Sequence, residues 1–201
     1  MIDDDIVVSA DDLLSHIALI ECHDIVSSII EHFPDNSIFF HASRILRGGR
    51  HANPSGSLLT VRTKATANAF FNIYNEDWFF FFLNPTARHV SKASVRQLPY
   101  DPFRDPHLAA WQEPYDLIAE GLNANGACAF TEVTASEEYW RAEISRRRAG
   151  YEAMLGLNTE TAIAACLQAG LRELSKVSPS FCTSFCATLR QTVEQDYRIA
   201  V

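Results

Sequence analysis

The sequence lacks the features that would place it in a membrane or a secretory pathway. None of its apolar runs approaches the about 20 residues that a helix needs to span a bilayer. The N-terminus carries Asp3, Asp4 and Asp5, where a secretory signal would carry lysine or arginine. We therefore expect a cytoplasmic protein with no membrane partner, in its own cell or, if it is a delivered effector, in a host cell.

The sequence also lacks the cysteine spacing of metal sites and disulfide frameworks. Its five cysteines are odd in number and contain no Cys-x-x-Cys pair. Cys182 and Cys186 share one face of a predicted helix, but no histidine nearby completes a ligand set. We therefore predict no metal, and reduced thiols that lie mostly in the core. The residues concerned are Cys22, Cys128, Cys166, Cys182 and Cys186.

A basic surface is missing as well. The formal net charge is −8, which disfavours a nucleic-acid partner because phosphate contacts dominate that kind of affinity. Apolar residues make up 47% and charged residues 21% of the chain, a balance typical of a folded soluble domain. No internal repeat or low-complexity tract is present. We predict a single domain over residues 1–201, and the sequence leaves the oligomeric state open.

Hydrophobic periodicity predicts the elements of the first half. A capping-box-like start at Ser9 and a helical apolar spacing predict one long or once-broken helix over residues 10–33. Its histidines, His16, His23 and His32, are interpreted as polar residues on a solvated face. Strands are expected at Ile38–His41 and Ser57–Arg62, with a helix at Thr66–Tyr74. Trp78–Leu83 has no alternation, so it is predicted to be a central strand covered on both faces.

The second half is predicted to become helical. Five prolines punctuate the segment from Asn84 to Pro114, whose secondary structure the sequence leaves open apart from a helical turn at His107–Gln112. The segment suits a flexible active-site loop, with a surface connection as the alternative. A short helix at Tyr115–Leu122 and a strand at Ala127–Val133 follow. Three helices then begin at a Thr134/Glu137 capping box, at Thr159 and at Ser180. The arginines of the first are read as a solvated face, with an anion site or a partner surface as the alternative. They are Arg141, Arg146, Arg147 and Arg148.

Together these elements predict an α+β fold. A small, central, mostly antiparallel sheet is expected to be flanked by helices. Its parts are the N-terminal helix over residues 10–33, a sheet-containing core over residues 37–135 and a helical C-terminal layer over residues 136–201.

Chemistry can be argued for the stretch that follows residue 37. His41 at a strand end could donate to a ribose hydroxyl or a carboxamide carbonyl, and an arginine fork on the adjoining loop could hold a pyrophosphate. Candidates for that fork are Arg44, Arg47 and Arg50. Glu132 is the acid best placed to stabilise an oxocarbenium-like transition state as nicotinamide leaves, with Glu137 and Glu138 as alternatives.

The residues from Ile38 to Leu83 resemble the N-terminal half of the ADP-ribosyltransferase superfamily. The match consists of Ile38-Phe-Phe-His41-Ala-Ser-Arg44, Leu58-Leu-Thr60-Val-Arg-Thr63 with Ala67-Asn-Ala69-Phe-Phe, and Trp78 to Leu83. In addition, Gly48-Gly49-Arg50-His51-Ala-Asn53-Pro54-Ser-Gly56 is similar to the Gly-Gly-Arg signature of the RES-domain toxins, which share that fold and consume NAD.

The resemblance implies that NAD is a substrate and assigns roles to seven residues. It implies a catalytic role for His41 and Glu132. The NAD-binding set is Arg44, Arg50, Ser57, Phe70 and Tyr74. This sequence departs from the family at Leu58-Leu59-Thr60, where a tyrosine is expected, and at Phe130-Thr131-Glu132, which supplies only the second acid of a Glu/Gln-x-Glu pair. A non-catalytic relative therefore stays an alternative.

Two functions follow from the sequence. The first is an NAD-consuming enzyme, a mono-ADP-ribosyltransferase or NAD glycohydrolase that acts as a toxin or effector. The alternative is a non-enzymatic, acidic interaction protein of an immunity, adaptor or chaperone-like kind that binds a partner through its helices. A protein partner is expected in both cases.

Overall fold

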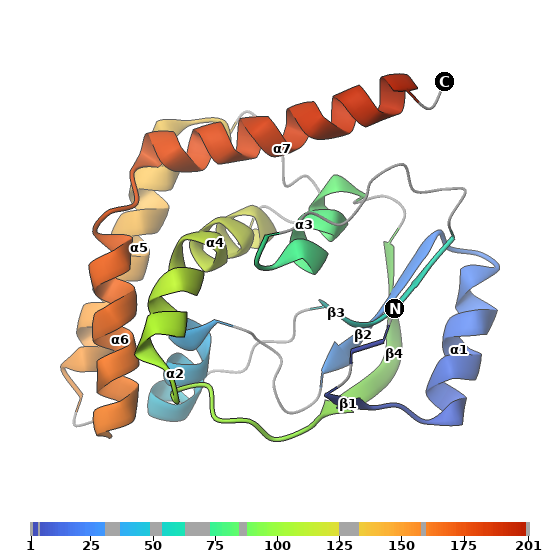
Figure 1. Ribbon diagram of the computed structural model, residues 1–201, viewed down its shortest axis with the longest axis horizontal. Coiled ribbons are helices and arrows are strands. Elements are labelled where there is room, and N and C mark those ends of the chain that lie inside the picture. Colours follow the sequence, from blue (N-terminus) through green and yellow to red (C-terminus); the bar gives the residue numbers. More distant parts are fainter. Residues whose placement is uncertain are drawn as a thin grey trace. The chain divides into compact units, whose positions relative to one another are not determined.

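The computed structural model describes residues 2–3, 5–30, 37–48, 54–62, 73–84, 88–124, 133–157 and 160–199. The chain divides into two compact units. The sheet unit consists of Met1–Asp35, His51–Tyr100 and Gln195–Val201, and the helical unit consists of Asn36–Arg50 and Asp101–Glu194. Figure 1 shows the elements of each. No described helix has the length and apolarity needed to cross a membrane.

The sheet unit contains four strands and two helices. In chain order they are β1 (Ile6–Val7), α1 (Ala10–Ile20), β2 (Ile25–Ile30), β3 (Pro54–Val61), α3 (Glu76–Leu83) and β4 (Arg88–Gln97). The strand order is β1-β4-β2-β3, in which the β2–β4 pair is parallel and the two outer pairs are antiparallel. The α+β class and the mostly antiparallel sheet are therefore confirmed. Two of the strands precede residue 37, where the predicted sheet core begins.

Helices α1 and α3 cover opposite faces of this sheet. Leu59 of β3 packs with Phe80 and Phe81 of α3, whereas the next residue, Thr60, bonds to His16 of α1. Because successive side chains of a strand point to opposite faces, the two helices must lie on different sides.

The helical unit is built from five helices among the described residues. They are α2 (Ile38–Arg47), α4 (Pro106–Ala124), α5 (Glu137–Leu155), α6 (Thr161–Leu174) and the greater part of α7 (Pro179–Ile199). Helices α5 to α7 confirm the predicted helical C-terminal layer. Ser136, two residues beyond the predicted Thr134, caps α5 by accepting a hydrogen bond from the Glu138 amide at 3.2 Å.

The predicted long helix over residues 10–33 is wrong in its second half. Helix α1 ends at Ile20, and residues 25–30 form β2. The side chain of Arg62 donates to the carbonyls of Ile20 and Glu21. In a helix that continued, backbone amides of the next turn would bond to these carbonyls. The apolar residues of β2 are β-branched and lie on both sides of Ser27 and Ser28, so its isoleucines fit a buried strand as well as a helical stripe.

Two predicted strands are helices. Ile38–His41 lies in α2, where the Ser37 hydroxyl caps the helix by accepting a hydrogen bond from the Phe40 amide at 3.1 Å. Trp78–Leu83 lies in α3, and its aromatic residues are all buried, so the predicted burial is confirmed while the element type is wrong. A short, continuous apolar run has no periodicity that separates a buried helix from a buried strand.

The segment between Asn84 and Pro114, for which the sequence predicted only a helical turn at His107–Gln112, is mostly regular, and that turn is confirmed as part of α4. Most of it forms β4 and the start of α4, a 19-residue helix that continues through Pro114. The predicted strand at Ser57–Arg62 is confirmed as part of β3, and the predicted helix at Tyr115–Leu122 as part of α4. The expectations for Thr66–Tyr74 and Ala127–Val133 fall mainly outside the described residues, as does the start at Thr159.

Candidate functional site

The predicted NAD-site residues are distributed over both units. His41 and Arg44 lie on α2 in the helical unit, and Ser57 and Tyr74 belong to the sheet unit. The remaining three, Glu132, Arg50 and Phe70, lie outside the described residues. His41 and Arg44 share helix α2, and the NAD-consuming activity stays a prediction.

His41 lies on a buried face of α2 rather than at a strand end. The residue is completely buried, and burial, with a smaller effect of Arg44, lowers the pKa of its imidazole to about 4. Gly48 ends the same helix at a φ of 72°, where its amide donates to the Arg44 carbonyl at 3.0 Å. Gly48, which belongs to the turn predicted to bind phosphate, therefore has a structural role as the C-cap of α2.

This buried imidazole predicts a loss of stability in acid. The pKa of His41 is about 4 in the folded chain against an ordinary 6.5, so the unfolded chain binds more protons below pH 6.5. Between pH 7.5 and pH 5, we expect the free energy of unfolding of the wild type to fall by about 2 kcal/mol relative to that of His41→Gln. Urea titrations at each pH, followed by circular dichroism, measure the free energy of unfolding of both proteins. Parallel pH profiles of the two proteins would contradict the expectation.

Ser57 and the two alternative acids occupy ordinary structural positions. Ser57 is buried in β3, where its amide donates to the Ser55 hydroxyl at 3.1 Å and its own hydroxyl accepts from that group at 2.9 Å. Glu137 and Glu138 are exposed in the first turn of α5, where acids favour the helix dipole.

The helical unit contains a buried ionic cluster that the sequence interpretation missed. Arg147 of α5 donates to both carboxylate oxygens of Glu113 of α4, at 2.6 and 2.9 Å, and also pairs with Glu120. Tyr151 donates its hydroxyl to Glu113. The guanidinium carbon of Arg147 lies 4.5 Å from the ring centroid of Phe39 on α2. One side chain thus links three helices.

The charges of this cluster stabilise one another. Burial would lower the pKa of Arg147, but the carboxylates of Glu113 and Glu120 outweigh it and hold that pKa above its ordinary value. Burial raises the pKa of Glu120 to about 7 despite the opposing effect of Arg147. The solvated face predicted for the arginines is correct for Arg141, Arg146 and Arg148 and wrong for Arg147. Because Glu113, Arg147 and Tyr151 are enclosed, we assign the cluster a structural role.

Helix α1 is oriented with its apolar side outward. Leu14 is 62% and Ile17 59% exposed, whereas His16 is 1% exposed. The exposed residues recur at the spacing of one helix face. We call this face the α1 stripe, and it consists of Ala10, Leu13, Leu14, Ile17 and Ala18.

His16 explains the orientation of α1. Its Nε2 lies 2.7 Å from the Ser28 hydroxyl of β2 and its Nδ1 3.1 Å from the Thr60 hydroxyl of β3. The sheet therefore presents hydroxyl groups to this helix, and a buried histidine satisfies them. Burial lowers the pKa of His16. The solvated position predicted for His16 is wrong, and the apolar stripe is exposed as a consequence.

The α1 stripe lies in an acidic part of the chain. Residues 1–30 contain seven acidic residues and neither lysine nor arginine. Asp11 and Asp12 lie at the N-terminal end of the stripe, directly after Ala10, and Glu21 and Asp24 follow it. Of these acids, Asp24 lies 3.8 Å from Nε of Arg62. The stripe is therefore an apolar surface with acidic groups at both ends.

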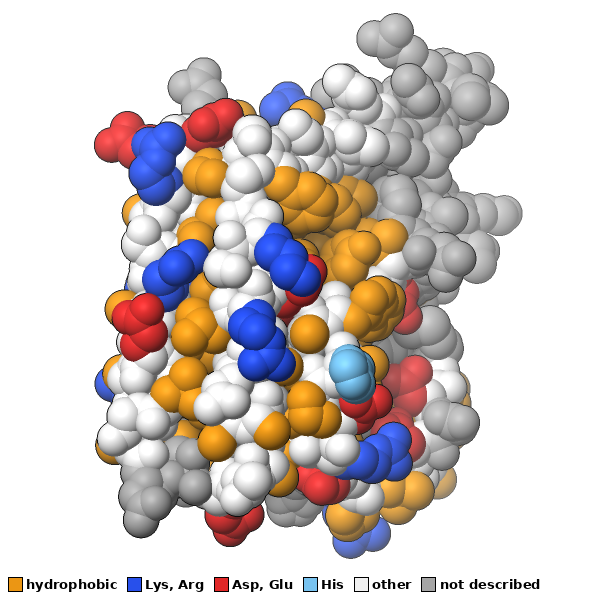
Figure 2. Space-filling model, turned by 60° about the vertical axis from the view of Figure 1, so that its left-hand side comes forward, with side chains coloured by type: hydrophobic (Ala, Val, Ile, Leu, Met, Phe, Trp, Pro, Cys, Tyr) orange, Lys and Arg blue, Asp and Glu red, His pale blue; other side chains and the backbone are white. Residues whose placement is uncertain are grey.

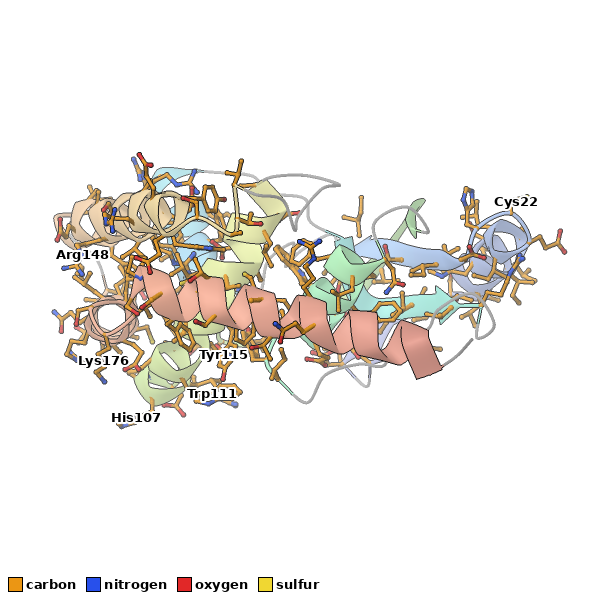
Figure 3. All side chains as sticks on the ribbon, turned by 90° about the horizontal axis from the view of Figure 1, so that it is seen from above. Cys22, His107, Trp111, Tyr115, Arg148 and Lys176 are labelled. Carbon is orange, nitrogen blue, oxygen red and sulfur yellow. The ribbon has the colours of Figure 1, made fainter. Side chains whose placement is uncertain are left out.

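A second exposed apolar group lies on the helical unit. Trp111 and Tyr115 project from α4, as Figure 3 shows, and their ring centroids are 6.0 Å apart. The ring of Tyr115 also contacts that of Phe185 on α7, and Phe185 contacts Phe181. In Figure 2 hydrophobic side chains are interspersed with lysine and arginine over the described face of this unit. Here the neighbouring charges are of both signs, whereas the charged residues within the first 30 residues are all acidic.

Comparisons with known proteins found no match to this chain among family models, curated proteins or solved structures. Within the described ranges, no three histidine, cysteine or acidic side chains gather as ligands for a metal ion. The described thiols are free, with Cys22 exposed at the end of α1 (Figure 3) and Cys166, Cys182 and Cys186 buried.

Proposed function

We propose that this chain is a protein-interaction module whose α1 stripe binds a basic, amphipathic helix of a partner protein. The observation that carries the proposal is the inverted orientation of α1, with Leu14 and Ile17 exposed and His16 buried. An exposed helical stripe of leucine and isoleucine is the kind of surface that receives a partner helix through positions i, i+3, i+4 and i+7.

The surrounding charge defines the chemistry of that partner. Acidic groups at both ends of the stripe favour a segment in which lysine or arginine flanks leucine or isoleucine. A second copy of this chain is a poorer occupant, because it would bring the acidic residues of two N-terminal segments together. The binding is expected to weaken with salt, since attraction between exposed charges is screened.

A designed peptide tests the proposal. The probe is a fluorescein-labelled amphipathic helix of leucine and lysine, and its binding is followed by fluorescence anisotropy. We expect Leu14→Ala with Ile17→Ala to weaken binding at least tenfold, because about 1 kcal/mol or more of apolar contact is lost at each position. Alanine keeps the helix propensity of α1, so the fold is retained.

A matched control is available on the helical unit. Leu108→Ala with Ile45→Ala removes the same two residue types from exposed positions on α4 and α2, and binding should change less than twofold. If the control substitutions weaken peptide binding, or if both double variants bind the peptide as tightly as the wild type does, the peptide does not bind at the α1 stripe. Light scattering of the chain alone at rising concentration shows whether the chain dimerises. A dimer that is lost in Leu14→Ala with Ile17→Ala would mean that a second copy of the chain, and not a partner protein, occupies the stripe.

A further inference from the structure

Helices α5 and α6 line an open hollow to which no role has been assigned. It has a volume of about 310 Å³ and lies within the helical unit. One face of each helix supplies the lining, because the two residues from α5 are four positions apart and those from α6 follow the spacing i, i+3, i+4 and i+7. The described lining residues are Arg148 and Glu152 of α5, and Gln168, Leu171, Arg172 and Ser175 at α6.

The four arginines of α5 differ in whether they have a partner. Three of them pair with glutamates, whereas Arg148 forms no ion pair or side-chain hydrogen bond with any described residue. Arg148 is exposed and lies on the α6 side of α5 (Figure 3), so its guanidinium is available to a ligand at the hollow. The three paired arginines are Arg141, Arg146 and Arg147.

Arg172 is the second available guanidinium of the hollow. It is exposed in the last turn of α6, and its side chain has no ion pair or hydrogen bond within the described ranges. The acid next to it in the chain, Glu173, is paired with Lys176 at 2.6 Å. Two unpaired guanidiniums therefore line the same hollow, and each presents a planar fork of N–H donors.

The other polar groups of the lining define what can bind between the arginines. The side-chain amide of Gln168 adds a further donor. The Ser175 hydroxyl already donates to the Arg172 carbonyl at 2.7 Å, so it offers an acceptor only. Glu152 is the one carboxylate among the described lining, and two arginines against one glutamate leave that lining with a net charge of +1. The hollow therefore favours an anion that can accept from both guanidinium forks.

We infer that this hollow binds the phosphate group of a phosphomonoester, with Arg148 and Arg172 paired with its oxygens. A phosphomonoester carries almost two negative charges at neutral pH and has three terminal acceptor oxygens, so it can accept from two forks at once. A carboxylate has one charge and two oxygens, and it matches a single fork. Such a site is independent of the α1 stripe, so Leu14→Ala with Ile17→Ala should leave phosphate binding unchanged.

Titration with a short phosphoserine peptide that is otherwise alanine, followed by ¹H–¹⁵N correlation spectra, tests the inference. We expect a Kd on the order of a millimolar, because the hollow is open and its charges are exposed to solvent. Amide signals of residues 148–152 and 168–175 should shift, while the unphosphorylated peptide should leave them in place. Arg148→Gln and Arg172→Gln should each weaken binding about fivefold or more, because each removes one charged donor fork.

Arg146→Gln is the matched control. This exposed arginine lies on the same helix, pairs with Glu143 and is not among the described lining of the hollow, so its loss should change binding less than twofold. Glu152→Gln removes the acid of the hollow and should strengthen binding. An equal loss in Arg146→Gln and Arg148→Gln, equal binding of the unphosphorylated peptide, or no shift at 20-fold the expected Kd would overturn the inference.

Inorganic phosphate distinguishes two sources of the phosphate group. It should shift the same amide signals as the peptide, and shifts confined to other residues would count against the site. A phosphopeptide that binds about fivefold more tightly than inorganic phosphate supports the site with a phosphorylated segment of a partner protein as its ligand. Equal affinities support the site with a small phosphate compound as its ligand.

Discussion

Arg147→Ala is expected to destabilise the helical unit by about 3–5 kcal/mol, the cost of leaving a buried charge without its partner. Glu113 is 1% exposed and would lose a two-point hydrogen-bonded ion pair, while Glu120 would lose its only cationic neighbour in the cluster. Urea unfolding followed by circular dichroism measures the change, because the helical unit supplies most of the helical signal.

The neighbouring arginine provides the control. Arg146 lies on the same helix with its side chain 68% exposed, so Arg146→Ala should change the free energy of unfolding by less than about 0.5 kcal/mol. Acid should partly rescue Arg147→Ala. Without the guanidinium, the folded-state pKa of Glu120 would lie further above its unfolded value. The folded variant would therefore bind the extra proton, and its stability relative to the wild type would rise as the pH falls from 8 toward 5. A variant that loses less than 1 kcal/mol at pH 8 would show that the cluster is not what holds these helices.

Phe80→Ala is expected to destabilise the sheet unit by about 3–5 kcal/mol. Phe80 is buried in the cluster with Ile25, Leu59 and Phe81, so removal of its ring would leave a cavity among these side chains. Hydrogen exchange of the β2 and β3 amides, read by mass spectrometry, reports the sheet unit separately from the helical unit.

Phe181→Ala is the matched substitution at the surface. Phe181 is 43% exposed, so truncation of its ring should cost less than about 1 kcal/mol and leave exchange in β2 and β3 unchanged. Equal effects of the two substitutions would mean that Phe80 does not pack as described.

Sequence patterns predicted burial in this chain better than they predicted element type. The aromatic run Trp78–Leu83 is buried as expected, but it carries neither period 2 nor period 3.6, so nothing in its spacing identifies α3 as a helix. The capping residue Ser37 was the available signal for α2, since its hydroxyl and the residues that follow it form an ordinary helix start. For β2, the boundary is the turn at residues 21–24, between Ile20 and Ile25. This turn contains neither glycine nor proline, so the sequence signals the end of α1 only weakly.

The candidate surface and the ionic cluster were beyond sequence patterns for a different reason. Helical spacing correctly indicates that α1 is amphipathic, but the side that faces the sheet is decided by two hydroxyls on strands. They belong to Ser28, 12 residues after His16, and to Thr60, 44 residues after it. Likewise, the run of arginines on α5 does not reveal which one meets Glu113, because that acid lies 34 residues earlier on another helix. Local pattern defines a face, and tertiary neighbours decide which face is buried.

The placement of α2 has a consequence for the order in which a newly made chain can fold. This helix is synthesised between the segments of the sheet unit, yet Phe39 packs edge-on against Tyr151 at 5.1 Å between ring centroids, more than a hundred residues later. As the chain leaves the ribosome, β2, β3 and β4 can pair before the helices that pack on α2 have been synthesised. Until then His41 of α2 is not buried by them. Helices α5 and α6 both contact α2. Completion of α6 should therefore be the step after which α2 becomes resistant to a protease, and nascent chains truncated before residue 137 should be cleaved within α2.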